Sequence, residues 1–195
     1  MDSRSIVVPA EESRVAPRLV KVLAVVLFAL LTALGARAAV PLPGTAVPVT
    51  LQTLFVLLAG ALLGPRLGAA SQVVYLAAGV AGLPAFVAGG GPAYLFGPTG
   101  GYLLAFPAVA AAAGWVARTA PARGAPALAW LFAGLFLASL IVFVGGAAQL
   151  AVLTGDPARA IQVGVLPFLV GDVVKVLVAG SVAYRLRERV ASALG

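Results

Sequence analysis

The sequence contains no cysteine and no histidine, and only 10% of its 195 residues are charged. The two absences exclude disulfides, thiolate metal sites, imidazole metal ligands and histidine-based catalysis. Soluble domains carry about 25% charged residues, so this chain has too few to cover its surface in water. The acids nearest a plausible site, Asp156 and Asp172, are too few for a carboxylate cage around a metal ion. We therefore expect no metal and no cofactor.

What the sequence has in abundance is apolar surface. Hydrophobic residues make up 62% of the chain, and its mean hydropathy is +1.10. The net charge is +7, but most basic residues flank apolar segments, which argues against a nucleic-acid-binding face. Backbone groups in lipid must bond within their own segment, and the alternation typical of a β-barrel is missing. We expect an all-α membrane protein with a single polytopic domain, 1–195, in which 1–18 is a short cytoplasmic lead.

Six apolar stretches have the length of helices that cross a bilayer. A hydrocarbon core of about 30 Å needs about 20 helical residues. The first stretch, followed by Ala36-Arg37-Ala38, also has features of a signal peptide. Its polar lead is long and all later stretches are apolar, so we expect a first membrane helix instead. The expected crossings are Leu19–Ala39, Val47–Leu63, Leu67–Leu83, Gly97–Val116, Pro126–Leu150 and Ile161–Tyr184.

The distribution of lysine and arginine predicts the orientation of the six crossings. Cytoplasmic loops carry an excess of these residues. If the N-terminus lies inside, ten basic residues fall on the inner side, two fall on the outer side, and Lys175 lies within the membrane. We therefore expect a bundle of six transmembrane helices with both termini cytoplasmic. The inner residues are Arg4, Arg14, Arg18, Lys21, Arg66, Arg118, Arg123, Arg185, Arg187 and Arg189, and the outer ones are Arg37 and Arg159.

The outer connection Leu83–Gly101 is rich in glycine and has no charged residue. Solvated loops are usually polar, whereas irregular backbone is tolerated at membrane depth where it lines a cavity. The bulky side chains at 94–96 would be poor linker residues. We therefore expect this loop to fold over a site; a flexible linker is the alternative. Thr99 is expected to cap the helix that follows.

Asp172 and Lys175 are the strongest candidates for a binding site. They lie three positions apart inside the last apolar stretch, so they share one helical face. Charges at membrane depth cost a few kcal/mol and normally face a protein interior or a watery cavity. The carboxylate can accept from ligand N–H groups and the ammonium can donate to ligand oxygens, and the two can pair when the site is empty. A structural ion pair and a proton relay are the alternatives.

Further candidates are polar, aromatic or small. Gln52 is expected either at the same cavity or in an interhelical hydrogen bond. Tyr102 and Tyr94 are expected to stack on a flat ligand ring or to belong to the interfacial aromatic belt. Ala29 and Ala33 let another helix approach closely, as internal packing or as a partner-docking face.

Several motifs, in this order, cover most of the chain. They are VPVTLQTL at 47–54, LGPR at 63–66, SQ at 71–72, GLP at 82–84, GPTGGYL at 97–103 and GDVVK at 171–175. Together they resemble the BioY family, the biotin-binding membrane subunits of energy-coupling factor (ECF) transporters.

The resemblance implies a biotin site toward the outer face and uptake into the cell across the cytoplasmic membrane. A transmembrane coupling protein and two cytoplasmic ATPases would drive this uptake, with tilting of the bundle. It also implies that Asp172 and Lys175 contact biotin and that Ala29 and Ala33 meet the coupling protein. The loop 88–93, AGGGPA, lacks the polar residue of some relatives, which leaves backbone groups for that contact.

The expected function is therefore biotin capture and uptake, without enzymatic activity of the chain itself. The sequence has no Gly-x4-Gly-Lys-Ser/Thr phosphate loop, in keeping with ATP hydrolysis by partner subunits. Serine proteolysis would need a base, and Ser139 and Ser181 are unpersuasive nucleophiles for Lys175. The alternative is a stand-alone, ion-coupled secondary carrier with Asp172 as the coupling acid, although no internal repeat supports it.

Overall fold

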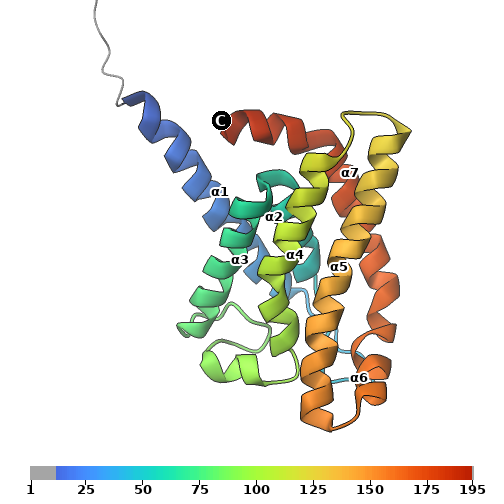
Figure 1. The fold of residues 1–195 in the computed structure, drawn as a ribbon. Helices are drawn as coiled ribbons and strands as arrows, with labels where there is room; N and C mark the ends of the chain where they lie inside the picture. The colour runs from blue at the N-terminus through green and yellow to red at the C-terminus, as the bar shows by residue number, and fades with distance from the viewer. Residues whose placement is uncertain (1–11, 195) are drawn as a thin grey trace, which may run out of the picture.

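The computed structural model describes residues 12–194, which form a bundle of helices (Figure 1). Residues 1–11 of the expected lead lie outside the described residues, and residues 12–18 already belong to the first helix. The long helices are α1 (Glu12–Arg37), α2 (Gln52–Leu63), α3 (Pro65–Val80), α4 (Gly100–Thr119), α5 (Ala125–Thr154) and α7 (Leu169–Leu194); α6 (Pro157–Gly164) and the 3₁₀ turns η1 (Pro92–Phe96) and η2 (Leu166–Phe168) are short.

The prediction of six main helices is confirmed, but they differ in length. Within residues 12–194, four helical segments are long and apolar enough to cross a membrane: Arg18–Arg37, α4, α5 and Pro157–Leu194. Helix α2 is apolar but has 12 residues, which is about 18 Å of helix. It packs against α1, α3, α4 and α7 and so forms the centre of the bundle.

The second expected crossing begins as extended chain rather than as a helix. Pro48 has no N–H group to donate. The amide of Val40 donates to the carbonyl of Val49 at 2.8 Å, and that of Val49 donates back at 2.9 Å. The helix therefore starts at Gln52 instead of Val47, and the extended residues before it become free to line a cavity.

The last expected crossing is interrupted. A continuous helix over Ile161–Tyr184 was expected, but α6 ends at Gly164 and α7 starts at Leu169. Pro167 lies in the turn between them and cannot donate the hydrogen bond that a continuing helix requires. Asp172 consequently lies in the first turn of α7 and not near the middle of a helix.

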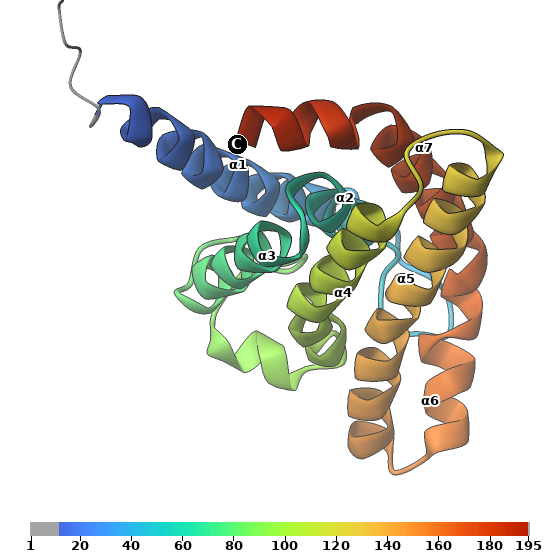
Figure 2. The same ribbon diagram turned by 45° about the horizontal axis from the view of Figure 1, so that its top comes forward.

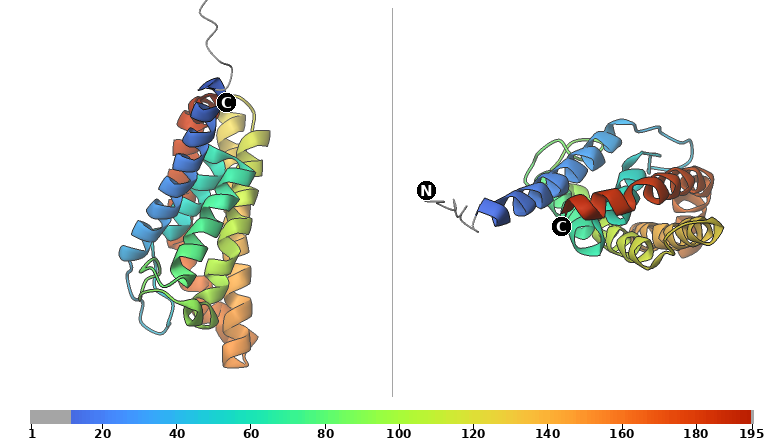
Figure 3. Two further views of the ribbon diagram at one scale, coloured as in Figure 1. Left: turned by 90° about the vertical axis from the view of Figure 1, so that its left-hand side faces the viewer. Right: turned by 90° about the horizontal axis from the view of Figure 1, so that it is seen from above.

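The two ends of the bundle differ in their connections. In Figure 1 the start of α1, the α2–α3 turn, the α4–α5 connection and the end of α7 lie at the top. The longer connections 38–51 and 81–99 and the short α6 lie at the bottom, and Figure 3 shows the same separation from the side. We call the top the basic end, because Arg66 at the start of α3, Arg118 at the end of α4 and Arg123 in the α4–α5 connection lie there, and the bottom the loop end.

The glycine-rich connection 81–99 packs on the bundle, as expected. Phe86 is fully buried, and its ring lies 5.7 Å from that of Tyr75 and 4.9 Å from that of Tyr94, centroid to centroid. Gly79 of α3 makes this possible, because a Cβ there would collide with the Phe86 ring. The Arg37 guanidinium, at the end of α1, donates to the Pro84 carbonyl. The loop is therefore held from both α1 and α3.

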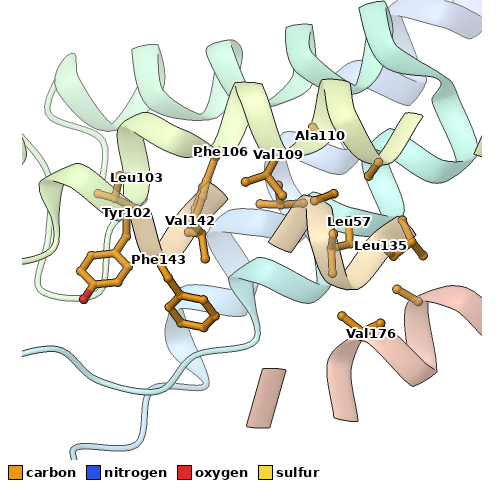
Figure 4. Close-up of a cluster of buried hydrophobic side chains, with 14 of the residues drawn as sticks. Leu57, Tyr102, Leu103, Phe106, Val109, Ala110, Leu135, Val142, Phe143 and Val176 are labelled. Atoms are coloured by element: carbon orange, nitrogen blue, oxygen red, sulfur yellow. The ribbon is translucent and has the colours of Figure 1, made fainter. Parts of the chain in front are cut away.

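The apolar core lies mainly between α2, α4, α5 and α7. Figure 4 shows Phe106 and Val109 of α4 opposite Val142 and Leu135 of α5, with Val176 of α7 nearby. All five are almost completely shielded from solvent. This packing fixes the first turns of α4 and α7 relative to α5, which matters for the site described next.

Ala29 and Ala33 pack inside the chain. Ala29 is buried in the core, and Ala33 is partly buried against it, where α1 meets α2 and α3. Their small side chains permit this close approach. The structure thus gives them the internal packing role, and a docking role remains a prediction.

Candidate functional site

A cavity lies where α2, α4 and α7 begin, so it is close to the loop end. It brings together all five side chains expected to bind a ligand: Asp172, Lys175, Gln52, Tyr102 and Tyr94. The sequence separates these residues by up to 123 positions, counted from 52 to 175. The other lining residues are Val47, Pro48, Val49, Thr50, Thr53, Val87, Thr99, Leu103, Phe106, Val142, Phe143 and Phe168.

Asp172 is held at the cavity by a hydroxyl group on another helix. Its side chain is 1% exposed, and Ser139 Oγ of α5 donates to Asp172 Oδ2 at 2.5 Å. Ser139 Oγ also lies 2.7 Å from the Phe136 carbonyl. A carboxylate has two oxygens and can accept several hydrogen bonds, so one serine leaves acceptor capacity for a ligand.

Lys175 has a separate partner on α2. Its Nζ donates to Thr53 Oγ1 at 2.9 Å. Across residues 12–194, no salt bridge joins Lys175 to Asp172, so the pairing considered for an empty site does not occur in this structure. The reason is geometric, because each charge finds a neutral hydroxyl on a different neighbouring helix. An ammonium has three donors, of which Thr53 uses one.

Gln52 forms the interhelical hydrogen bond that was one of its two expected roles. Its Nε2 donates to the Tyr75 hydroxyl of α3 at 2.5 Å. Its Oε1 accepts from Thr50 Oγ1 at 3.2 Å. The side chain also lines the cavity, so it both joins α2 to α3 and presents an amide group at the edge of the site.

The two tyrosines line the cavity through different supports. The Tyr102 hydroxyl donates to the Gly164 carbonyl at 2.7 Å, which joins α4 to the break before α7. Its ring packs against Gly146 of α5, where any Cβ would overlap it. Tyr94 stacks on Phe86 in the loop that covers the site. The Tyr102 hydroxyl therefore stabilises the packing of α4 against the end of α6, and its ring forms part of the cavity wall.

Two features of the covering loop differ from expectation. Thr99 occupies the N-cap position of α4, but its side chain makes no capping hydrogen bond. Its φ and ψ of −97° and −8° are helical, whereas a capping side chain usually needs an extended backbone. Gln149 of α5 holds the loop instead, with Nε2 donating to the carbonyls of Leu95 at 2.9 Å and Gly97 at 2.5 Å.

The sequence did not predict three features of the site: the hydrogen bonds of Gln149 to the covering loop, the hydrogen bond of Ser139 to Asp172, and the aromatic side chains of the cavity walls. Ser139 was considered only as a nucleophile. Its partner is 33 positions away, and no local pattern indicates such a contact. Phe106, Phe143 and Phe168 resemble any other apolar residue of the chain until the helices are packed together.

The chemistry of the cavity is mixed. One carboxylate, one ammonium, threonine hydroxyls and the Gln52 amide supply both acceptors and donors, while phenylalanine, valine and leucine form apolar walls. Small-molecule sites are typically apolar pockets with a few well-placed polar groups. The site therefore suits a small ligand with an apolar body and a polar group that carries both N–H and carbonyl functions.

Over most of its length, the chain is similar to proteins named as biotin transporters. The model of the BioY family matches residues 10–192. The "Probable biotin transporter BioY" of Pyrococcus horikoshii is 40% identical over 84% of this chain and 93% of its own length. The "Biotin transporter BioY" of Thermotoga maritima is 35% identical over 83% of this chain and 92% of its own.

A solved structure shares the fold. The crystal structure of the S-component for biotin from an ECF-type ABC transporter superposes with a TM-score of 0.79 at 24% sequence identity. The match covers 88% of this chain and 92% of that one. The family match spans nearly all of the described residues, including every residue that lines the cavity. This chain belongs to the BioY family.

Proposed function

We propose that this chain is the biotin-binding membrane subunit of an ATP-driven ECF transporter. Its family, relatives named as biotin transporters and the composition of the cavity support this function. The cell membrane is the proposed location, with the basic end on the cytoplasmic side in keeping with the positive-inside rule.

One observation carries the proposal. Asp172 and Lys175 face one cavity, and each is held by a neutral hydroxyl rather than by the other. Both therefore keep hydrogen-bonding capacity for a ligand. The ureido ring of biotin has two N–H donors and one carbonyl acceptor. Asp172 would accept from the N–H groups, and Lys175 would donate to a biotin oxygen.

The apolar walls would take the remaining parts of the ligand. Phe106, Phe143 and Phe168 offer surfaces for the sulfur-containing ring and the aliphatic tail. Tyr94 and Val87 belong to the covering loop, so biotin would enter from the loop end beneath residues 81–99. This entry side is opposite the basic end, in keeping with capture from outside the cell.

Energy for release to the inside would come from other subunits. The sequence has no phosphate-binding loop, and ECF transporters as a class pair such a subunit with a transmembrane coupling protein and two cytoplasmic ATPases. ATP use by these partners would tilt the bundle and turn the loop end toward the cytoplasm.

Binding of radiolabelled biotin to the purified chain tests the site. Asp172→Asn keeps the side-chain volume and removes the charge. A hydrogen bond to a charged group contributes about 1.5–3 kcal/mol, so we expect roughly 10- to 150-fold weaker binding. Asp156→Asn is the matched control, because Asp156 caps α6 by accepting from the Arg159 amide and does not line the cavity. Full-strength binding by Asp172→Asn would refute the assignment.

Reconstitution separates this function from that of a stand-alone carrier. Proteoliposomes that contain the chain alone should bind biotin but show no uptake driven by an ion gradient. Gradient-driven uptake without ATPases would favour a secondary carrier with Asp172 as its coupling acid.

A further inference from the structure

A second cavity lies at the basic end, far from the biotin site along the bundle axis. It is enclosed by α1, the α2–α3 turn, the end of α4 and the end of α7, which crosses the top of the bundle toward α1 (Figure 2). Its lining contains four basic residues and one acid. We call this cavity the basic groove; its charged members are Lys21, Arg66, Arg118, Arg187 and Glu188.

Two of these cations have no counterion among the residues that the structure describes. Arg66 and Arg118 are exposed, and among the described residues neither has a hydrogen-bond or salt-bridge partner. They lie on adjoining elements, because the Cδ of Arg118 is 3.9 Å from the position of a Cβ on Gly64, in the α2–α3 turn. Glu188 forms a salt bridge with Arg123 at 3.5 Å and is thereby directed to a residue outside the groove.

Arg187 adds a buried positive charge and shapes the groove. Its Nη1 donates to the Ala117 carbonyl at 2.9 Å, and its Nη2 donates to the carbonyls of Pro121 and Ala122. These acceptors are the end of α4 and the residues after it, where the helix dipole favours a cation. All these partners are carbonyl groups, so Arg187 has no salt bridge within residues 12–194, and its side chain holds α7 across the end of α4.

The same groove has an apolar wall. Leu62, Leu63 and Leu67 line it from α2 and α3, and Leu194 lines it from α7. Cations beside leucines match a molecule with an anionic head and a hydrocarbon tail. Basic pockets between membrane helices on the cytoplasmic side bind anionic lipid headgroups, and arginine pairs well with phosphate oxygens. An acidic protein segment would use the charges but would have less use for the leucines.

We propose that the basic groove binds an anionic membrane lipid, with Arg66 and Arg118 on its phosphodiester group and the acyl chains along the leucine wall. This site is independent of the biotin site, because the two cavities share no lining residue.

The test measures retention of phosphatidylglycerol relative to phosphatidylcholine by the purified full chain, using native mass spectrometry. Arg66→Gln/Arg118→Gln removes the two unpartnered cations. Arg185→Gln/Arg189→Gln removes the same charge from exposed positions of α7 that do not line the groove. Each basic residue near a membrane surface contributes enough for about fivefold in affinity, so we expect about 25-fold weaker phosphatidylglycerol retention in the groove variant only.

Four outcomes would overturn the proposal. Equal loss in both double variants would mean that net charge alone attracts the lipid. Equal retention of phosphatidylcholine by the unmodified chain would mean that the groove does not select an anion. Full displacement of the lipid by inorganic phosphate at matched concentration would mean that the site takes a soluble anion. Unchanged lipid retention with loss of assembly with other transporter subunits would assign the groove to a protein partner instead.

Discussion

Replacing Ser139 with alanine tests whether a ligand and this serine donate hydrogen bonds to the same carboxylate, that of Asp172. In the structure, Ser139 Oγ is the hydrogen-bond donor to Asp172, whose side chain is 1% exposed. Removing one partner and leaving a buried acceptor unsatisfied costs about 1–3 kcal/mol, and more when the acceptor is charged. For a chain of this length, about 2 kcal/mol corresponds to a fall in Tm of about 4–8 °C.

The biotin-bound protein should lose less stability on the same substitution. When the ureido N–H groups of biotin donate to Asp172, the carboxylate keeps other partners, and only the net value of one hydrogen bond, about 0.5–1.5 kcal/mol, is lost. The stabilisation by saturating biotin should therefore be larger in Ser139→Ala than in the unmodified protein, by about 1 kcal/mol. Thermal unfolding with and without biotin measures this difference.

A matched control is Ser181→Ala. The Ser181 hydroxyl donates to the carbonyl of Leu177 within α7, is exposed and does not line the cavity. It should leave both Tm values almost unchanged. If Ser139→Ala lowers Tm equally with and without biotin, the ligand does not supply donors to Asp172, and the reasoning fails.

Two further predictions concern the elements that frame the site and the groove. Phe86→Ala removes a fully buried ring between Tyr75 and Tyr94, and truncations of this kind cost about 3–5 kcal/mol of stability. The loop 81–99 should therefore become protease-sensitive, and biotin should dissociate faster. An unchanged dissociation rate would argue against the loop as a cover. Arg187→Lys keeps the charge but loses the planar guanidinium that contacts several carbonyls, so Tm should fall. The exposed Arg189→Lys is the control and should leave Tm unchanged. Equal Tm values for the two variants would contradict the role of Arg187 in holding α7 to the end of α4.

The sequence predicted the features that depend on composition and on charge. Apolar stretches indicated six main helices, and a charge pair in the last stretch indicated the cavity. Burial of charge is costly wherever it occurs, so Asp172 and Lys175 stood out without knowledge of their neighbours.

The missed features depend on contacts between distant segments. Thr53 and Lys175 are 122 positions apart, and threonine is common in membrane helices, so nothing local marks it as the ammonium's partner. The break before α7 was also missed, although Gly164 and Pro167 were visible. Hydropathy measures how apolar a stretch is and not whether its helix is continuous, so an interrupted segment is predicted as a single crossing.

Helix α7 has an implication for how the two ends of the molecule affect each other. Its first turn carries the proposed ligand contact, and Arg187 follows 15 residues later, about 22 Å along a helix. Helix α7 therefore runs without interruption from the cavity to the basic groove, although it bends where it turns across the top of the bundle (Figure 2). The Arg187 contacts join the end of α7 to the end of α4, so a shift or rotation of the first turn would strain either this bend or these contacts.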